Sequence, residues 1–245
     1  MYSIREKIRR LLRSECPLCG LDAWGGDLCS PCQRIVRFDY DAHSYCWRCW
    51  GVLLETSLAT RKEGTRRWCE PCLQNPNYYA RVIAGIHFTS PGDRLMRGFK
   101  AQGRLTDAGL FARLLWRNMH RYASELPRFE ALVAIPSGHQ AMLQRGQNPA
   151  GEIARELAAL SGVQLKRSLL LRTREVSRQK TLGWHARQRS TCGLYACPVT
   201  ISGGWIGLVD DVLTTGTTLE RASQALLQAG AGGVVALVAA RTLAK

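Results

Sequence analysis

Four repeated cysteine pairs constrain the first third of the chain more than any other feature. Eight of the ten cysteines fall in Cys-x-x-Cys pairs within residues 16–72. The pairs are Cys16/Cys19, Cys29/Cys32, Cys46/Cys49 and Cys69/Cys72. Each pair can place two thiolates on one tetrahedral metal ion, and two pairs complete a closed site of four cysteines. The repeated spacing therefore predicts two structural zinc ions.

A redox role is the alternative, but that chemistry expects a single Cys-x-x-Cys pair beside a strand–helix unit. The pairing of the four motifs stays open at this point. Sequential pairing needs only short loops, and interleaved pairing would also satisfy the spacing. Because a segment this small and rich in loops buries little core, the metal would supply much of its stability.

The length of 245 residues allows one sizeable core and a small additional domain. The turn-rich sequence Asn75-Pro76-Asn77 predicts a boundary between them. We therefore expect an N-terminal helix and double zinc ribbon over residues 1–75 and a larger domain over residues 76–245. Ser3 and Glu6 form a capping-box pattern, which predicts a short basic amphipathic helix over residues 3–13.

The chain is strongly basic, with a net charge of +15 and a pI near 9.8. This balance favours polyanionic partners such as nucleic acid or phosphorylated substrates, although a merely basic surface is the alternative. The first residues are charged throughout, unlike a signal peptide. No run approaches the roughly 20 apolar residues of a membrane span. The sequence thus predicts a cytoplasmic location without membrane insertion.

Apolar runs alternate with helical patterns after residue 80. We expect strands over residues 81–88, 131–136, 168–171, 206–209 and 233–240. We expect helices over residues 91–100, 106–123, 150–160 and 219–229. Strands that alternate with helices indicate an α/β fold with a mostly parallel, doubly wound, Rossmann-like sheet.

The strand expected over residues 206–209 ends in two adjacent acids, Asp210 and Asp211. A small polar turn follows, and then a helical pattern begins. The turn consists of Thr214, Thr215, Gly216, Thr217 and Thr218. Backbone N–H groups at the start of a helix bind anions, and carboxylates bind sugar hydroxyls or Mg²⁺. The stretch therefore predicts a sugar-phosphate site.

The most basic stretch, residues 166–189, carries eight Lys or Arg and one acid. Its central part, residues 173–180, has little apolar periodicity and is predicted to be a loop. Such a loop could close over a pyrophosphate group or grip a nucleic-acid backbone. A solvated loop without a ligand is the alternative.

These features together resemble a known family. The sequence over residues 209–218, VDDVLTTGTT, is similar to the phosphoribosyl-pyrophosphate signature of type I phosphoribosyltransferases. The wider pattern resembles the ComF family of competence-associated proteins, which includes GntX-type proteins. It comprises the four cysteine pairs, Gly98-Phe99-Lys100, Arg145-Gly146-x-Asn148, and Arg178-Gln179-x-x-Leu182 followed by Arg187. Gln147 stands where the family commonly has Phe.

The resemblance implies a type I phosphoribosyltransferase-like domain that binds phosphoribosyl pyrophosphate with Mg²⁺. Asp210 and Asp211 would hold the ribose hydroxyls and, partly through water, the Mg²⁺ ion. The turn over residues 214–218 would cradle the 5′-phosphate. The remaining implied residues are Ser137, Gly138 and Arg145 on the pyrophosphate side, and Arg174, Gln179 and Arg187 in the flexible loop.

Three functions fit these residues. The protein could transfer the phosphoribosyl group of phosphoribosyl pyrophosphate to an unknown acceptor, with displacement of pyrophosphate, which would make it a phosphoribosyltransferase. It could handle single-stranded DNA during uptake, as the family's link to natural transformation implies. It could also dock a protein partner such as a DNA-uptake helicase. For the DNA function, the candidate base-stacking side chains are Trp47, Trp50, Trp68 and Trp184, although burial is the commoner fate of tryptophan.

Overall fold

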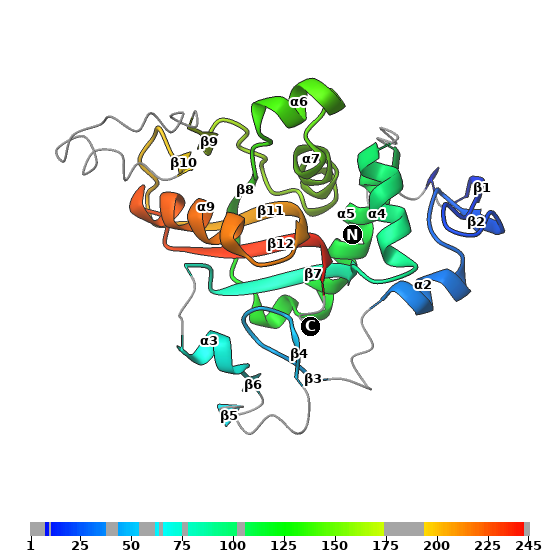
Figure 1. The fold of residues 1–245 in the computed structure, drawn as a ribbon, viewed down its shortest axis with the longest axis horizontal. Helices are drawn as coiled ribbons and strands as arrows, with labels where there is room; N and C mark the ends of the chain where they lie inside the picture. The colour runs from blue at the N-terminus through cyan, green and yellow to red at the C-terminus, as the bar shows by residue number, and fades with distance from the viewer. Residues whose placement is uncertain are drawn as a thin grey trace, which may run out of the picture.

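A computed structural model describes most of the chain. It covers residues 8–9, 11–37, 44–53, 62–63, 66–74, 78–101, 106–173 and 194–242. Its centre is a parallel sheet with strand order β7-β12-β11-β8 (Figure 1). The strands are β7 (Arg81–His87), β8 (Phe129–Ala134), β11 (Trp205–Leu213) and β12 (Gly233–Arg241). The α/β fold class predicted from the sequence is confirmed.

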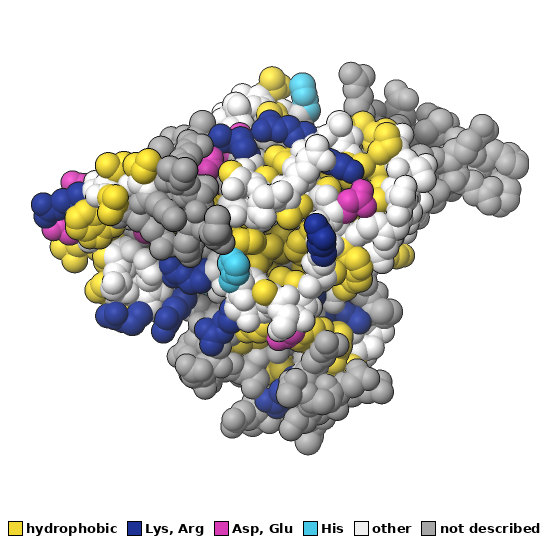
Figure 2. All heavy atoms as spheres, turned by 180° about the vertical axis from the view of Figure 1, so that it is seen from behind, with side chains coloured by type: hydrophobic (Ala, Val, Ile, Leu, Met, Phe, Trp, Pro, Cys, Tyr) yellow, Lys and Arg dark blue, Asp and Glu magenta, His cyan; other side chains and the backbone are white. Residues whose placement is uncertain are grey.

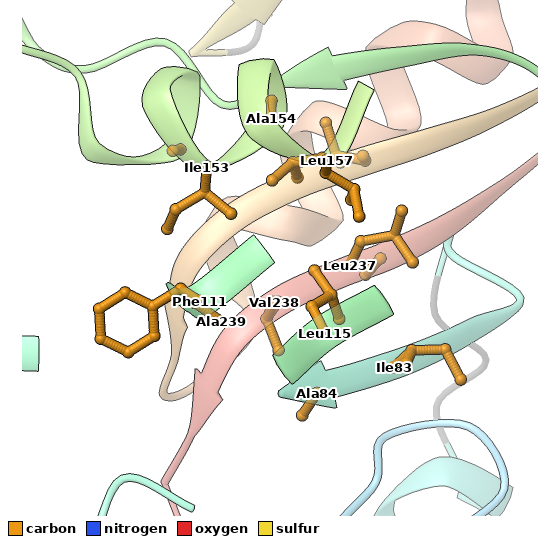
Figure 3. Close-up of a cluster of buried hydrophobic side chains, with 14 of the residues drawn as sticks. Ile83, Ala84, Phe111, Leu115, Ile153, Ala154, Leu157, Leu237, Val238 and Ala239 are labelled. Atoms are coloured by element: carbon orange, nitrogen blue, oxygen red, sulfur yellow. The ribbon is translucent and has the colours of Figure 1, made fainter. Parts of the chain in front are cut away.

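Helices cover both faces of this sheet. Helices α5 (Thr106–Arg121) and α7 (Pro149–Ser161) pack against each other on one face, and α9 (Thr217–Gln228) lies on the other (Figure 1). Figure 3 shows Phe111 and Leu115 of α5 and Ile153 of α7 gathered against β12. Because both faces are covered, every residue of β12 is buried. Two shorter helices complete this part: α4 (Gly92–Ala101) and α6 (His139–Arg145).

The direction in which the chain crosses the sheet reverses between β8 and β11. After α7 the chain returns beside β8, where Leu132 pairs in parallel with Leu165. The connections through α5 and α7 therefore move the chain one way, and the connection through α9 moves it the other way, from β11 to β12. Open α/β sheets bind ligands outside the carboxyl ends of their strands at such a switch point.

The strand expected over residues 168–171 is wrong. The chain has already paired with β8 at Leu165, and Leu169 and Leu170 are buried within a bend. Only a short strand β9 (Leu171–Arg172) follows, and it pairs antiparallel with β10 (Tyr195–Ala196) away from the main sheet. The apolar pattern reflected burial, which a bend provides as well as a strand does. Helix α6 was not expected either, because it is short and half its side chains are polar.

Two small cysteine-rich units precede the sheet. The first ribbon, residues 11–37, holds β1 (Arg13–Glu15), β2 (Asp22–Trp24) and α2 (Ser30–Val36). The second ribbon, described over residues 44–53, 62–63 and 66–74, holds β3 (Ser44–Tyr45), β4 (Val52–Leu53), β5 (Lys62–Glu63), β6 (Arg66–Arg67) and α3 (Glu70–Gln74). In Figure 1 the first ribbon lies beside α4 and α5, and the second lies below β7.

Most of the helix predicted over residues 3–13 lies outside the described residues, and the part that is described reaches β1 by Arg13. Among the described helices, none has the length and apolar character needed to cross a membrane.

Candidate functional site

The first metal site is built by a hairpin and the start of a helix. Cys16 and Cys19 follow β1, and Cys29 and Cys32 lie at the start of α2. The four sulfur atoms lie within 4.8 Å of one another, and the Sγ atoms of Cys19 and Cys29 are 3.6 Å apart. A tetrahedral zinc site with bonds of about 2.3 Å has edges of about 3.8 Å. The geometry therefore fits one tetrahedral metal ion.

The second metal site repeats this arrangement. Cys46, Cys49, Cys69 and Cys72 form a group within the same 4.8 Å limit, and the Sγ atoms of Cys49 and Cys69 are 3.6 Å apart. The motifs thus pair sequentially, and interleaved pairing is excluded. Hydrogen bonds from the neighbouring thiols, chiefly Cys49, lower the pKa of Cys46, whereas the hydrogen bond with Cys46 raises the pKa of Cys69 and of Cys72.

The acidic pair lies where β11 extends beyond the end of its pairing with β8. Strand β8 is paired with β11 only as far as Val209, whereas β12 continues alongside β11 to Leu213. Asp210 and Asp211 therefore have a strand on one side only, and their other side faces the switch point. They lie within β11, because pairing with β12 extends the strand beyond the apolar run from which its end was predicted.

The two carboxylates are in different environments. Asp210 is buried, and its Oδ1 accepts a hydrogen bond from the Asp211 N–H at 2.8 Å. Burial, and then the negative charge of Asp211, raise the pKa of Asp210 to about 8. Asp211 pairs with Lys100 of α4, whose Nζ is 2.8 Å from Oδ2. A cation bound beside Asp210 would lower this pKa again, because it favours the ionised carboxylate.

The predicted phosphate turn leads directly into α9. Gly216 is the N-cap of this helix with a φ of 86°, a left-handed conformation that favours glycine. Within the described structure no side chain caps α9, so N–H groups of its first turn can meet an anion. The hydroxyls of Thr215 and Thr217 lie 3.2 Å apart beside them.

The turn after β8 faces the same edge of the sheet. Asn148 braces it, because its amide donates to the Ile135 carbonyl at 3.0 Å and accepts from the Ser137 hydroxyl at 2.9 Å. Gly138 lies close to the guanidinium of Arg172 in β9. Arg145 lies at the far end of α6 and donates to the Ala141 carbonyl of its own helix at 3.3 Å.

The three loop residues Arg174, Gln179 and Arg187 lie outside the described part of the chain. The short β9–β10 hairpin forms the base of that segment, with the Thr173 N–H bonded to the Leu194 carbonyl at 3.1 Å. Lys100 and Arg172 are cations near the site that were not assigned from the sequence. Lys100 belongs to the Gly98-Phe99-Lys100 pattern, so the resemblance marked the position without giving it a partner.

The fold and the sites define a class: an α/β, Rossmann-like protein with an acidic pair at the switch point of its sheet and two ribbons of four cysteines each. No family model matches the chain. It is 30% identical to the DNA utilization protein YhgH of Salmonella typhi over 93% of this chain and 97% of that protein. Identity to YhgH of Escherichia coli K12 is 27% over the same shares. The competence protein F of Haemophilus influenzae is 26% identical over 83% of this chain and 85% of its own length. The chain belongs to the ComF family, together with these YhgH and competence F proteins.

Proposed function

We propose that this protein binds phosphoribosyl pyrophosphate with Mg²⁺ and acts in DNA utilisation by handling single-stranded DNA. The observation that carries the first part is the position of Asp210 and Asp211. They lie beside the start of α9, which no described side chain caps, at the carboxyl edge of the sheet where the crossover connections reverse direction. A sugar bearing a phosphate needs both groups at one place: oxygen acceptors for its hydroxyls and N–H donors for its phosphate.

In this proposal each part of the ligand meets a different element. Asp210 and Asp211 accept hydrogen bonds from the ribose hydroxyls and hold Mg²⁺, partly through water. The turn over residues 214–218 binds the 5′-phosphate. Ser137, Gly138 and Arg145 belong to the pyrophosphate side, and Arg172 is added there by its position over Gly138. The Mg²⁺ ion would offset the charge of the pyrophosphate oxygens. Arg174, Gln179 and Arg187 close the site.

We assign Zn²⁺ to both ribbons, because all-cysteine tetrahedral sites are typical of structural zinc. Closing each ribbon around a metal ion holds loops that have little core of their own.

The DNA part rests on charge and on the relatives. Their names refer to DNA utilization and competence, and this chain carries a net charge of +15. Figure 2 shows Lys and Arg side chains spread over one face, with Asp and Glu side chains interspersed and a group of Lys and Arg together at its lower left. Of the tryptophans suggested for base stacking, Trp50 is buried and Trp47 lies against the Arg81 guanidinium at 3.5 Å. Trp24 of the first ribbon is exposed and better suited.

Calorimetric titration of the zinc-loaded protein with phosphoribosyl pyrophosphate and Mg²⁺ tests the sugar-phosphate part. The double variant Asp210→Asn/Asp211→Asn should lose binding, because amides cannot replace two carboxylates at a cation. Asp22→Asn is the matched control, since Asp22 pairs with Arg13 on the exposed surface of the first ribbon. Unchanged affinity in the double variant would show that the ligand does not use this site.

Fluorescence anisotropy with labelled oligothymidine over a salt series tests the DNA part. Affinity should fall as salt rises, because contacts to phosphates release counterions. Trp24→Ala should weaken binding if bases stack on this ring. Absent binding, or an affinity independent of salt, would rule out single-stranded DNA as a direct partner. Adding phosphoribosyl pyrophosphate then shows whether the two ligands compete.

A further inference from the structure

One buried arginine joins the second ribbon to the phosphate turn. Arg241 is the last residue of β12 and is 7% exposed. Its Nε donates to the Cys49 carbonyl at 2.8 Å, and its Nη1 donates to the Thr214 carbonyl at 3.1 Å. Cys49 belongs to the second cysteine cluster, and Thr214 opens the turn that leads into α9.

We infer that Arg241 is a positioning residue that sets the conformation of the phosphate turn from the second ribbon. The role of the turn in anion binding rests on the function proposed above, whereas the coupling itself does not. Neither Arg241 nor the second ribbon needs to touch the ligand. The turn would be ordered when the second ribbon is closed and the guanidinium bridges the two carbonyls.

The chemistry of the guanidinium suits this role. It is planar and rigid and carries donors in a fixed fork, so two acceptors held by it keep a fixed relative position. A lysine ammonium is a single point of donation on a flexible stem and fixes two carbonyls less well. Because the site is buried, losing the donors leaves both carbonyls without these bonds, which is costly.

Neighbouring contacts place the ribbon and the turn close together on both sides of Arg241. A Cβ added to Gly51 would lie 3.3 Å from the Cys49 Sγ and 3.7 Å from the Arg241 Nη2, so the three residues are close together. Next along the chain, the N–H and the hydroxyl of Thr242 donate to the Leu213 carbonyl at 3.0 and 3.2 Å. The end of β12 is thus bonded to the residue before the turn.

Tyr79 also packs against the phosphate turn. It is buried, and its hydroxyl oxygen is 3.3 Å from the Cβ position of Gly216. It thereby limits the space beside the N-cap of α9.

The first ribbon makes no such connection among the described residues. Its polar contacts go to α5: Arg113 donates to Asp27 at 2.5 Å and to the Gly26 carbonyl at 3.1 Å. Arg117 donates to Gln33 at 3.0 Å. The coupling is therefore specific to the second ribbon.

Hydrogen–deuterium exchange of the zinc-loaded protein tests the inference directly. Arg241→Met should keep both zinc ions but speed amide exchange in the peptide spanning residues 205–218 by about tenfold, roughly the effect of losing one or two buried hydrogen bonds. Arg241→Lys should restore part of the protection. Arg81→Met is the matched control, because Arg81 is also buried and contacts Trp47 of the same ribbon, but lies at the amino end of β7.

The outcomes separate this inference from the proposed function. Unchanged exchange at residues 205–218 in Arg241→Met, or an equal change in Arg81→Met, would overturn the coupling. If Arg241→Met does not fold, Arg241→Lys decides the question. Amide protection equal to that of the native protein overturns the coupling. Faster amide exchange confined to residues 205–218 supports it. If the native protein does not bind phosphoribosyl pyrophosphate, the proposed function fails, and the exchange comparison still decides the coupling. If it does bind, Arg241→Met should weaken affinity and Arg81→Met should not.

Discussion

The two cysteine ribbons share one local design but differ in how they join the rest of the protein. In each, the N–H of the first cysteine bonds to the carbonyl five residues on, from Cys16 to Leu21 at 2.7 Å and from Cys46 to Gly51 at 2.8 Å. In each, the second cysteine pair lies at the start of a short helix. The metal-binding unit is therefore repeated almost bond for bond.

The ribbons differ at the residue that follows the first Cys-x-x-Cys pair. Gly20 takes a φ of 75° there, and Trp50 takes a φ of 60° at the corresponding place. A left-handed conformation costs a residue with a Cβ about 1–2 kcal/mol relative to glycine. Trp50 offsets this cost by burial, because its ring meets Tyr122 edge-on at 5.1 Å and is 2% exposed.

The exposure of large apolar side chains also differs between the two ribbons. The first ribbon leaves Leu21, Trp24 and Ile35 exposed, whereas the second buries Trp50 and Leu53. The first ribbon meets α5 through an ion pair and hydrogen bonds, and its buried residues, Ala23, Leu28 and Val36 among them, belong to the main core. In the second ribbon, Cys46, Leu53 and Cys72 form a small cluster of their own. The second supplies an aromatic residue to the core and a carbonyl to Arg241. The two ribbons thus join the sheet domain by different means: the first through α5, and the second through Trp50 and the hydrogen bond from Arg241 at the end of β12.

Removing the metal from one ribbon at a time should give the largest difference between them. Structural zinc contributes about 10 kcal/mol or more to the folding of small zinc domains. Cys46→Ser/Cys72→Ser should therefore lower the unfolding temperature of the whole protein, since Trp50 of the second ribbon lies in the main core and Arg241 bonds this ribbon to the end of β12. Cys16→Ser/Cys32→Ser should unfold the first ribbon and leave a cooperative transition for the sheet domain. Zinc analysis with thermal unfolding measures both, and equal effects would contradict the distinction.

Truncating one tryptophan in each ribbon should give the next largest difference. Trp50→Ala should cost about 3 kcal/mol or more, because it removes a fully buried ring while alanine, which also has a Cβ, keeps the cost of the left-handed position. Trp24→Ala should change the free energy of unfolding by no more than about 0.5 kcal/mol, since its side chain is largely exposed. Urea unfolding of both variants gives these values. A loss from Trp24→Ala as large as that from Trp50→Ala would mean that the first ribbon is more integrated than its exposure indicates.

Much of this organisation could be predicted from the sequence. The cysteine spacing predicted two four-cysteine sites, and the alternation of strands and helices predicted the parallel sheet with helices on both faces. These signals depend on periodicity within a short window. The strand placed at residues 168–171 was wrong for the same reason, because Leu169 and Leu170 are apolar and buried in a bend.

What the sequence could not predict are the contacts between distant segments. The pairing of Lys100 with Asp211 and the bridge from Arg241 to Cys49 and Thr214 join residues that no local pattern relates. Arg241 ends an apolar strand and looks like an ordinary basic terminus.

A variant without the Asp210 charge tests whether a change in stability at the acidic pair also changes the stability of the second ribbon. The pKa of this carboxyl is about 8 in the folded protein and about 3.9 when unfolded. The folded state therefore holds a proton that the unfolded state has lost, and stability falls as pH rises between these values. Asp210→Asn removes this loss, so it should exceed the native protein in stability by about 1–3 kcal/mol at pH 8.

Near pH 4 the advantage of Asp210→Asn should largely vanish, because the carboxyl is then neutral in the folded state and mostly neutral in the unfolded state. Urea unfolding at the two pH values measures the difference. Zinc loss to a chelator at pH 8 should slow for the second ribbon and stay unchanged for the first. The opposite pH trend would mean that Asp210 is ionised in the folded protein.

Breaking the polar contact of the first ribbon should give the smallest effect. Asp27 pairs with Arg113 of α5, and both side chains are largely covered, with 22% and 14% exposed. Asp27→Asn keeps the shape but removes the charge, and should cost about 1 kcal/mol because hydrogen bonds to charged groups are stronger than neutral ones. The loss should appear as faster amide exchange in residues 11–37, with exchange in the sheet unchanged. If the sheet also loses protection, the first ribbon stabilises the sheet as the second one does, and the distinction between the two ribbons does not hold.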